Sequence, residues 1–144
     1  MNILRKHREF FASQKTKDLT FRKEVLKRLQ KEIMTREDDI AEAIYQDFKK
    51  PKFETLAAET QFVLAELKLT LKNIANWAGP ERKSGTLLNW PSSDRIYKEP
   101  YGAVLIVAPW KYPFQLVFAP MIGAIAAGNT VVVKPSEHTP HTAS

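Results

Sequence analysis

Two apolar segments, joined by a turn and a helical stretch, decide how this chain folds. The first reads Pro100-Tyr-Gly-Ala-Val-Leu-Ile-Val-Ala-Pro-Trp-Lys-Tyr-Pro-Phe-Gln-Leu116, and the second reads Gly123-Ala-Ile-Ala-Ala-Gly-Asn-Thr-Val-Val-Val-Lys-Pro-Ser-Glu137. The pattern predicts a strand, a Pro/Trp turn, a buried helix and a second strand, which together form the first βαβ unit of a parallel sheet. In open sheets of this kind, ligands bind in the crevice at the carboxyl ends of the strands. We therefore expect part of a binding site where these two strands end.

The boundaries of this βαβ unit follow from its prolines and glycines. The predicted strands are Gly102–Ala108 and Thr130–Val133, and their near-continuous apolar character is typical of strands buried on both faces. Pro113 suits the first turn of the connecting helix, because the N–H that proline lacks has no partner there. Gly128 fits the left-handed position just past the helix end. Thr139-Pro140 begins a further helix.

Three amphipathic helices are predicted before this unit. Apolar side chains recur at helical spacing between residues 21 and 33. A second helix begins after Thr35-Arg36-Glu37-Asp38, which matches a capping box with Thr35 as the cap, and it stops at Lys49-Lys50-Pro51. A third runs from about Phe53 to Trp77 and ends at Gly79-Pro80.

A hairpin is predicted between the helices and the βαβ unit. Glu81–Gly85 is interpreted as a polar linker, and Thr86–Trp90 and Arg95–Lys98 as two short strands around a Pro91-Ser92-Ser93-Asp94 turn. The expected fold class is therefore α/β, and the expected parts are helices (1–85), a hairpin (86–99) and the start of a Rossmann-like domain (100–144).

The charge distribution indicates that this fold is incomplete by itself. Residues 1–50 carry 13 Lys/Arg and 9 Asp/Glu, whereas residues 101–144 carry only Lys111, Lys134 and Glu137. Two apolar strands need more neighbours than three helices supply, so the sequence is interpreted as the first part of a larger fold. The net charge of +6 is mixed with acids on helix faces, without the aromatic-interleaved basic stripe of a nucleic-acid-binding domain.

The motifs of the chain closely resemble the aldehyde dehydrogenase superfamily, and within it the class 3 branch. They comprise Leu19-Thr-Phe-Arg22, Asp47-Phe-Lys-Lys-Pro-Lys-Phe-Glu54, Leu87-Leu-Asn-Trp-Pro-Ser92, Tyr97-Lys-Glu-Pro-Tyr-Gly102 and Lys134-Pro-Ser-Glu137. The resemblance implies an enzyme that oxidises aldehydes to carboxylic acids with NAD or NADP. It also implies a hairpin that helps to build a homodimer interface. The expected location is the cytoplasm.

The resemblance also implies which residues contact the cofactor. They are Ala108, Pro109 and Trp110 after the first strand, and Lys134, Pro135, Ser136 and Glu137 after the second. Lys134 and Glu137 would contact the adenosine ribose, and the backbone of the first loop would line the cofactor. The Gly-x-Gly-x-x-Gly fingerprint is absent from this unit, as it is from the resembled family. Two alternatives stay open: a surface Lys/Glu pair that caps the next helix, and a core aromatic at position 110.

Lys111 occupies the position at which the family typically has Asn, the donor to the oxyanion formed when a thiolate attacks the aldehyde. Such a donor commonly contributes about 3–4 kcal/mol of transition-state stabilisation. Lysine can also donate a hydrogen bond, but it is longer and more strongly hydrated. The alternative is a substitution in a chain that no longer depends on this role.

The chemistry of the resembled family also needs residues that this chain lacks. There is no cysteine to act as the nucleophile, and no carboxylate falls in a motif for the general base. This chain alone is therefore predicted to be catalytically incompetent, and the alternative function is a non-enzymatic truncated module that associates with itself or with a complementary or homologous subunit. His7, His138 and His141 lack metal-ligand spacing, so no metal site is proposed. The uncharged stretch 112–133 is interrupted by prolines and is not expected to span a membrane.

Overall fold

A computed structural model describes residues 2–85 and 87–144 of the protein. The helices are α1 (Ile3–Ala12), α2 (Leu19–Thr35), α3 (Glu37–Phe48), α4 (Lys52–Thr55), α5 (Gln61–Ala78), α6 (Gln115–Ala126) and α7 (Pro140–Ala143). The strands are β1 (Glu81–Lys83), β2 (Asp94–Ile96), β3 (Ala103–Val107) and β4 (Thr130–Lys134). No helix in these described ranges has both the length and the apolar character needed to cross a bilayer.

The predicted βαβ unit is confirmed. Strands β3 and β4 pair in parallel, with a register that runs from Ala103 opposite Thr130 to Val107 opposite Lys134, and α6 lies between them in sequence. Gly128 follows α6 with a φ of 91°, a left-handed conformation that glycine adopts without steric cost. The side-chain oxygen of Asn129 accepts a hydrogen bond from the Gly102 N–H at 3.0 Å. This bond ties the start of one strand to the start of the other.

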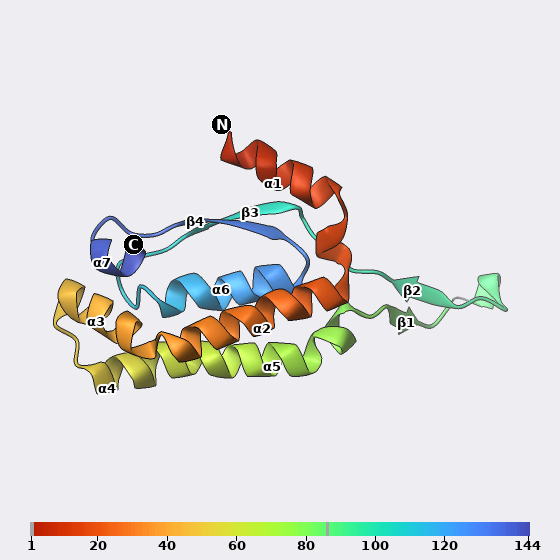
Figure 1. The fold of residues 1–144 in the computed structure, drawn as a ribbon. Coiled ribbons are helices and arrows are strands. Elements are labelled where there is room, and N and C mark those ends of the chain that lie inside the picture. The colour runs from red at the N-terminus through yellow and green to blue at the C-terminus, as the bar shows by residue number, and fades with distance from the viewer. Residues whose placement is uncertain (1, 86) are drawn as a thin grey trace.

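The strand pair lies between two helical layers, as Figure 1 shows: α1 on one side, and α6 on the other with α2 and α5 beneath it. The core joins residues of α2, α3, α5 and α6, and it comprises Leu26, Ile33, Ile44, Val63, Leu67, Ile74, Phe114 and Ile122. The prediction that both strand faces are buried is wrong for this chain, because Leu105 and Val107 are each 64% exposed. Helix α1 covers only part of that face.

The second predicted helix starts differently from its prediction. Thr35 is the last residue of α2, and its hydroxyl donates to the Lys31 carbonyl at 2.5 Å instead of capping α3. The expected acidic first turn is present, since Glu37 and two aspartates open α3. Lys49 ends α3 in a left-handed conformation with a φ of 56°, and Pro51 follows as predicted.

The third predicted helix is one continuous helical run with a change of winding. A π-helical turn, Leu56–Thr60, joins α4 to α5, and the run ends before Gly79-Pro80 as predicted. Turns of this kind occur frequently at functional sites. Here the π turn contains Glu59 and Thr60, both fully buried.

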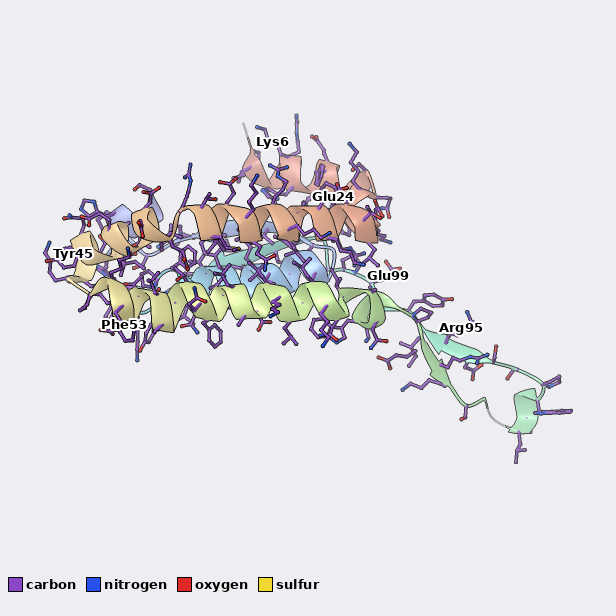
Figure 2. All side chains as sticks on the ribbon, turned by 60° about the horizontal axis from the view of Figure 1, so that its bottom comes forward. Lys6, Glu24, Tyr45, Phe53, Arg95 and Glu99 are labelled. Carbon is purple, nitrogen blue, oxygen red and sulfur yellow. The ribbon has the colours of Figure 1, made fainter. Side chains whose placement is uncertain are left out.

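The hairpin exists, and β2 overlaps the second predicted strand, Arg95–Lys98, but the first strand is not the predicted one. β1 pairs antiparallel with β2, with Arg82 opposite Arg95, so pairing begins inside the segment interpreted as a linker. The expected strand Thr86–Trp90 is wrong, because Leu87–Asn89 forms a short 3-10 turn; its first residue, Thr86, lies outside the described residues. The hairpin projects from the body (Figure 1), and Figure 2 shows Arg95 far from Tyr45 and Phe53 at the opposite end.

Candidate functional site

The two loops expected to hold the site begin side by side. Val107 and Lys134, the last residues of β3 and β4, are paired in the register. The next N–H, that of Ala108, donates to the Lys134 carbonyl at 3.1 Å. In Figure 1 these strand ends lie at the end of the body opposite the hairpin, near α3 and α7. The fold thus brings the two predicted cofactor-binding loops to one edge of the sheet.

Lys134 and Glu137 form an ion pair at this edge. The Lys134 ammonium donates to the Glu137 carboxylate at 2.6 Å, and their side chains are 57% and 71% exposed. The hydrogen bond from Lys134, more than any other contact, lowers the pKa of Glu137 to about 2. The pair therefore offers one permanent anion and one cation to solvent, next to the strand ends.

Ser136 and Pro135 serve the same loop in another way. Ser136 is buried, and its hydroxyl oxygen accepts a hydrogen bond from the His138 N–H at 3.2 Å. The buried Thr139 hydroxyl donates to the Ser136 carbonyl at 3.2 Å. Pro135 is half-buried and lines a hollow between α6 and α7. These contacts fix the loop, from which Lys134, Glu137 and His138 project as exposed polar side chains.

The cap of α7 comes from α3. The Asp47 carboxylate accepts hydrogen bonds from the His141 N–H at 3.1 Å, the Thr142 N–H at 2.8 Å and the Thr142 hydroxyl at 2.7 Å. Burial alone would raise the pKa of Asp47, but the bonds from Thr142 and His141 outweigh burial and lower it. The alternative interpretation of Glu137 as the cap of this helix is therefore wrong, and sequence reasoning missed Asp47.

The first loop exposes an aromatic side chain. Ala108 is 7% exposed, whereas Pro109 is exposed and Trp110 is 54% exposed. The Trp110 ring leans on Phe48 of α3, with centroids 6.3 Å apart, so it is a partly covered surface aromatic instead of a core residue. A hollow of about 390 Å³ lies beside it, lined in part by Lys50, Lys111 and Tyr112.

Lys111 lies on this hollow and is exposed. Its ammonium is 5.5 Å from the centroid of the Tyr112 ring, and the ammonium of Lys50 is 4.5 Å from the same centroid. Tyr112 has a φ of 47°, which is uncommon for a residue with a side chain. The turn that carries Lys111 is thus unusual in its backbone, and it must be held by its surroundings.

Glu59 supplies part of that support. Its carboxylate is fully buried beneath the turn and accepts hydrogen bonds from the Phe114 N–H at 2.9 Å and the Gln115 N–H at 3.3 Å. Its other oxygen accepts from the Lys50 ammonium at 2.7 Å. Sequence reasoning missed this residue. The available signal was spacing, since Glu59 precedes Val63 and Leu67 at four-residue intervals on the inward face of the helix.

The described residues contain no cluster of three or more His, Asp or Glu side chains suited to a metal ion. The side chains that this edge offers are an ion pair, a partly exposed indole, and the Lys111 ammonium beside a hollow.

Comparison with known proteins identifies relatives. A model of the "Aldehyde dehydrogenase family" matches residues 2–144. The 4,4'-diaponeurosporen-aldehyde dehydrogenase of Staphylococcus aureus is 49% identical over an alignment 147 residues long, which covers 99% of this chain and 32% of that protein. The dimeric NADP-preferring aldehyde dehydrogenase of Mus musculus is 39% identical over 142 residues, 99% of this chain and 31% of that protein.

A solved structure of the substrate-bound state of Staphylococcus aureus AldH superimposes with a TM-score of 0.95 at 49% identity. The match covers 99% of this chain and 32% of that chain. This chain therefore spans about a third of the length of the relatives that it matches.

Proposed function

The chain belongs to the aldehyde dehydrogenase family and is class 3-like, and from that premise we propose that it is the N-terminal part of an NAD(P)-dependent enzyme that oxidises aldehydes to carboxylic acids. The observation that carries the proposal is the exposed Lys134–Glu137 ion pair at 2.6 Å, set beside the Ala108–Trp110 loop. An anion and a cation at the carboxyl ends of parallel strands suit a nucleotide with ribose hydroxyls and phosphates.

In this proposal the two loops bind the dinucleotide. Glu137 accepts hydrogen bonds from ribose hydroxyls, and its low pKa keeps it ionised for that purpose. Lys134 donates to the ribose or to a phosphate. The backbone of Ala108, Pro109 and Trp110 lines the cofactor, whereas Pro135 and Ser136 hold the second loop in shape. When bound, NAD(P) accepts the hydride that leaves the substrate.

Lys111 is proposed as the donor to the aldehyde oxygen. It stands on the turn after Trp110, beside the hollow, with its ammonium exposed. A preorganised donor at the point where negative charge develops stabilises the transition state. The chain has no thiol to form a covalent adduct with the aldehyde, so the nucleophile and the general base are proposed to come from residues outside this chain.

The proposal extends to assembly and location. The parts are taken as helices (1–85), a hairpin of the subunit interface (86–99) and the start of the cofactor domain (100–144). The projecting hairpin supports a homodimer, and the mouse relative is named as dimeric. The cytoplasm is the proposed location.

A second candidate function is a non-enzymatic module that acts by association. The observation that favours it is the exposed apolar tip of the hairpin, where Leu87, Leu88 and Trp90 are 95%, 96% and 80% exposed. Exposed apolar patches of this kind mark contacts with other protein surfaces.

Two measurements on the complete protein as it occurs in its source distinguish these functions. One is the aldehyde-dependent reduction of NAD and NADP, and the other is the intact mass of the protein. The proposed enzyme requires a mass larger than that of this chain, a reactive thiol and turnover. A natural product without a thiol and without turnover, but with stable self-association, would favour the module instead.

A further inference from the structure

Two side chains hold the Lys111–Tyr112 turn: Glu59 of the π turn and Lys50 of the connection between α3 and α4. Glu59 accepts hydrogen bonds from the two N–H groups that follow the turn, those of Phe114 and Gln115. A carboxylate is favoured there, because the first N–H groups of α6 lack partners within the helix and carry its positive dipole end. The start of α6 is therefore pinned to the π turn at 56–60.

Lys50 connects this anchor to the turn itself. Its ammonium lies 2.7 Å from the Glu59 carboxylate, and the two side chains are only 13% and 0% exposed. The same ammonium lies 4.5 Å from the centroid of the Tyr112 ring, within the range of a cation–π interaction. Tyr112 is the residue with the left-handed backbone. One buried ion pair thus contacts the turn at its ring and at the amides that follow.

We propose that Glu59, held by Lys50, is a positioning residue that fixes the turn carrying Lys111, and so fixes the donor that faces the aldehyde oxygen. The inference rests on the proposed function of this site. A buried pair that binds the amides after a strained turn and contacts the ring of that turn restricts it to one arrangement. Rigid support of this kind governs how well a donor is aimed, because a misplacement of about 1 Å costs about a hundredfold in rate.

The test is made on the complete protein with the Glu59→Gln substitution, which keeps the shape of the side chain and removes its charge. Amide exchange at Phe114 and Gln115, followed by mass spectrometry, should become about tenfold faster or more, because charge-assisted bonds become neutral ones. The kcat for aldehyde oxidation should fall about tenfold to a hundredfold. The KM for the dinucleotide should stay unchanged. A general structural defect would instead change both the kcat and this KM.

Two further variants complete the experiment. Lys50→Met combined with Glu59→Gln replaces the buried ion pair with a neutral pair, which buried sites tolerate better than a lone charge. Folding should therefore be preserved, and the faster amide exchange and the lower kcat should persist. Glu66→Gln is the matched control, a carboxylate two turns further along the same helical run, and it should alter neither amide exchange nor kcat.

The outcomes separate this inference from the function on which it rests. Unchanged exchange at Phe114 and Gln115 in a folded variant would overturn the anchor. Faster exchange with an unchanged kcat would overturn the positioning role. An unsubstituted complete protein that oxidises no aldehyde would instead overturn the proposed function.

Discussion

The two ends of the molecule are held in different ways. At the candidate site, carboxylates bind the ends of helices: Glu59 is fully buried at the start of α6, and the half-buried Asp47 caps α7. At the hairpin, Glu81 pairs with Lys98 at 2.7 Å and with Lys83 at 3.5 Å, and all of these side chains are about half exposed. Buried pairs fix one arrangement, whereas exposed pairs contribute little to stability.

The difference shows which part of the molecule is shaped by contacts within this chain. The loops of the site are shaped by contacts within its own residues, so their geometry is set here. The residues of β1 and β2 are all exposed, and the apolar tip of the hairpin has no cover from the body (Figure 2). The hairpin therefore lacks the buried contacts with the body that shape the loops of the site.

The largest expected effect is the absence of catalysis when this chain is tested without the rest of the complete protein. Purified residues 1–144 should give no aldehyde-dependent reduction of NAD or NADP, because no thiol is present to form a covalent adduct. Absorbance of the reduced nicotinamide provides the measurement, with the complete protein as the positive control. Turnover above the buffer background that disappears on substitution of Lys111 would contradict this account.

A direct comparison of the two ends comes from removing one carboxylate at each. Glu59→Ala should lower the free energy of unfolding by about 3–5 kcal/mol, because it leaves the Lys50 ammonium buried without its partner. Glu81→Ala should leave it unchanged within error, because Glu81 is exposed with its partners. Denaturant titration of both variants measures the contrast. Equal losses at the two sites would show that burial does not distinguish the two ends.

A smaller effect is expected at the cap of α7. Asp47→Ala should cost about 1 kcal/mol, seen as faster amide exchange at His141 and Thr142. Because hydrogen bonds lower the folded-state pKa of Asp47, its stabilisation is present above the ordinary value of about 3.9 and is lost as the pH falls through the lowered value. The difference between variant and unsubstituted protein should therefore vanish at low pH. A difference that grows in acid would refute this assignment.

The smallest effect on folding is expected at the hairpin tip. Leu88, which is 96% exposed, makes no core contact to lose, so Leu88→Ser should leave the unfolding midpoint unchanged. The isolated chain should nevertheless self-associate through its exposed apolar surfaces, and the substitution should weaken that association in sedimentation experiments. A clean monomer that binds no hydrophobic dye before any substitution would sink this prediction.

Sequence patterns predicted the parts of the fold that local chemistry determines. The apolar runs and the positions of Pro113 and Gly128 were sufficient for β3, α6 and β4, because strand burial and helix ends leave strong local signals. The edge that carries Lys134 and Glu137 followed from the same pattern. The capping box at Thr35 was wrongly predicted. A threonine hydroxyl can bond either to an N–H of the following helix or to a carbonyl of its own helix, and here Thr35 donates to the Lys31 carbonyl within α2.

Tertiary contacts explain what the sequence did not reveal. The pairing of β1 with β2 places Arg82 opposite Arg95, a polar register without the alternation that marks strands. Helix α1, which was not predicted, buries none of its residues fully, although its Phe10 ring lies 6.0 Å from the Phe21 ring of α2. Glu59 and Asp47 act on helix ends that are 55 and 94 residues away in sequence. Spacing places Glu59 on the inward face of its helix, but no local pattern identifies a partner at such a separation.

Calorimetry on the complete protein and its Glu137→Gln variant tests whether Lys134 and Glu137 hold the ribose of a dinucleotide. The substitution should weaken NAD binding, because an amide accepts hydroxyl hydrogen bonds less strongly than a carboxylate. NADP binding should suffer less, because the lost carboxylate no longer repels the 2′-phosphate while Lys134 remains to attract it. Equal losses for the two cofactors, or no loss for either, would place Glu137 away from the ribose and contradict the account.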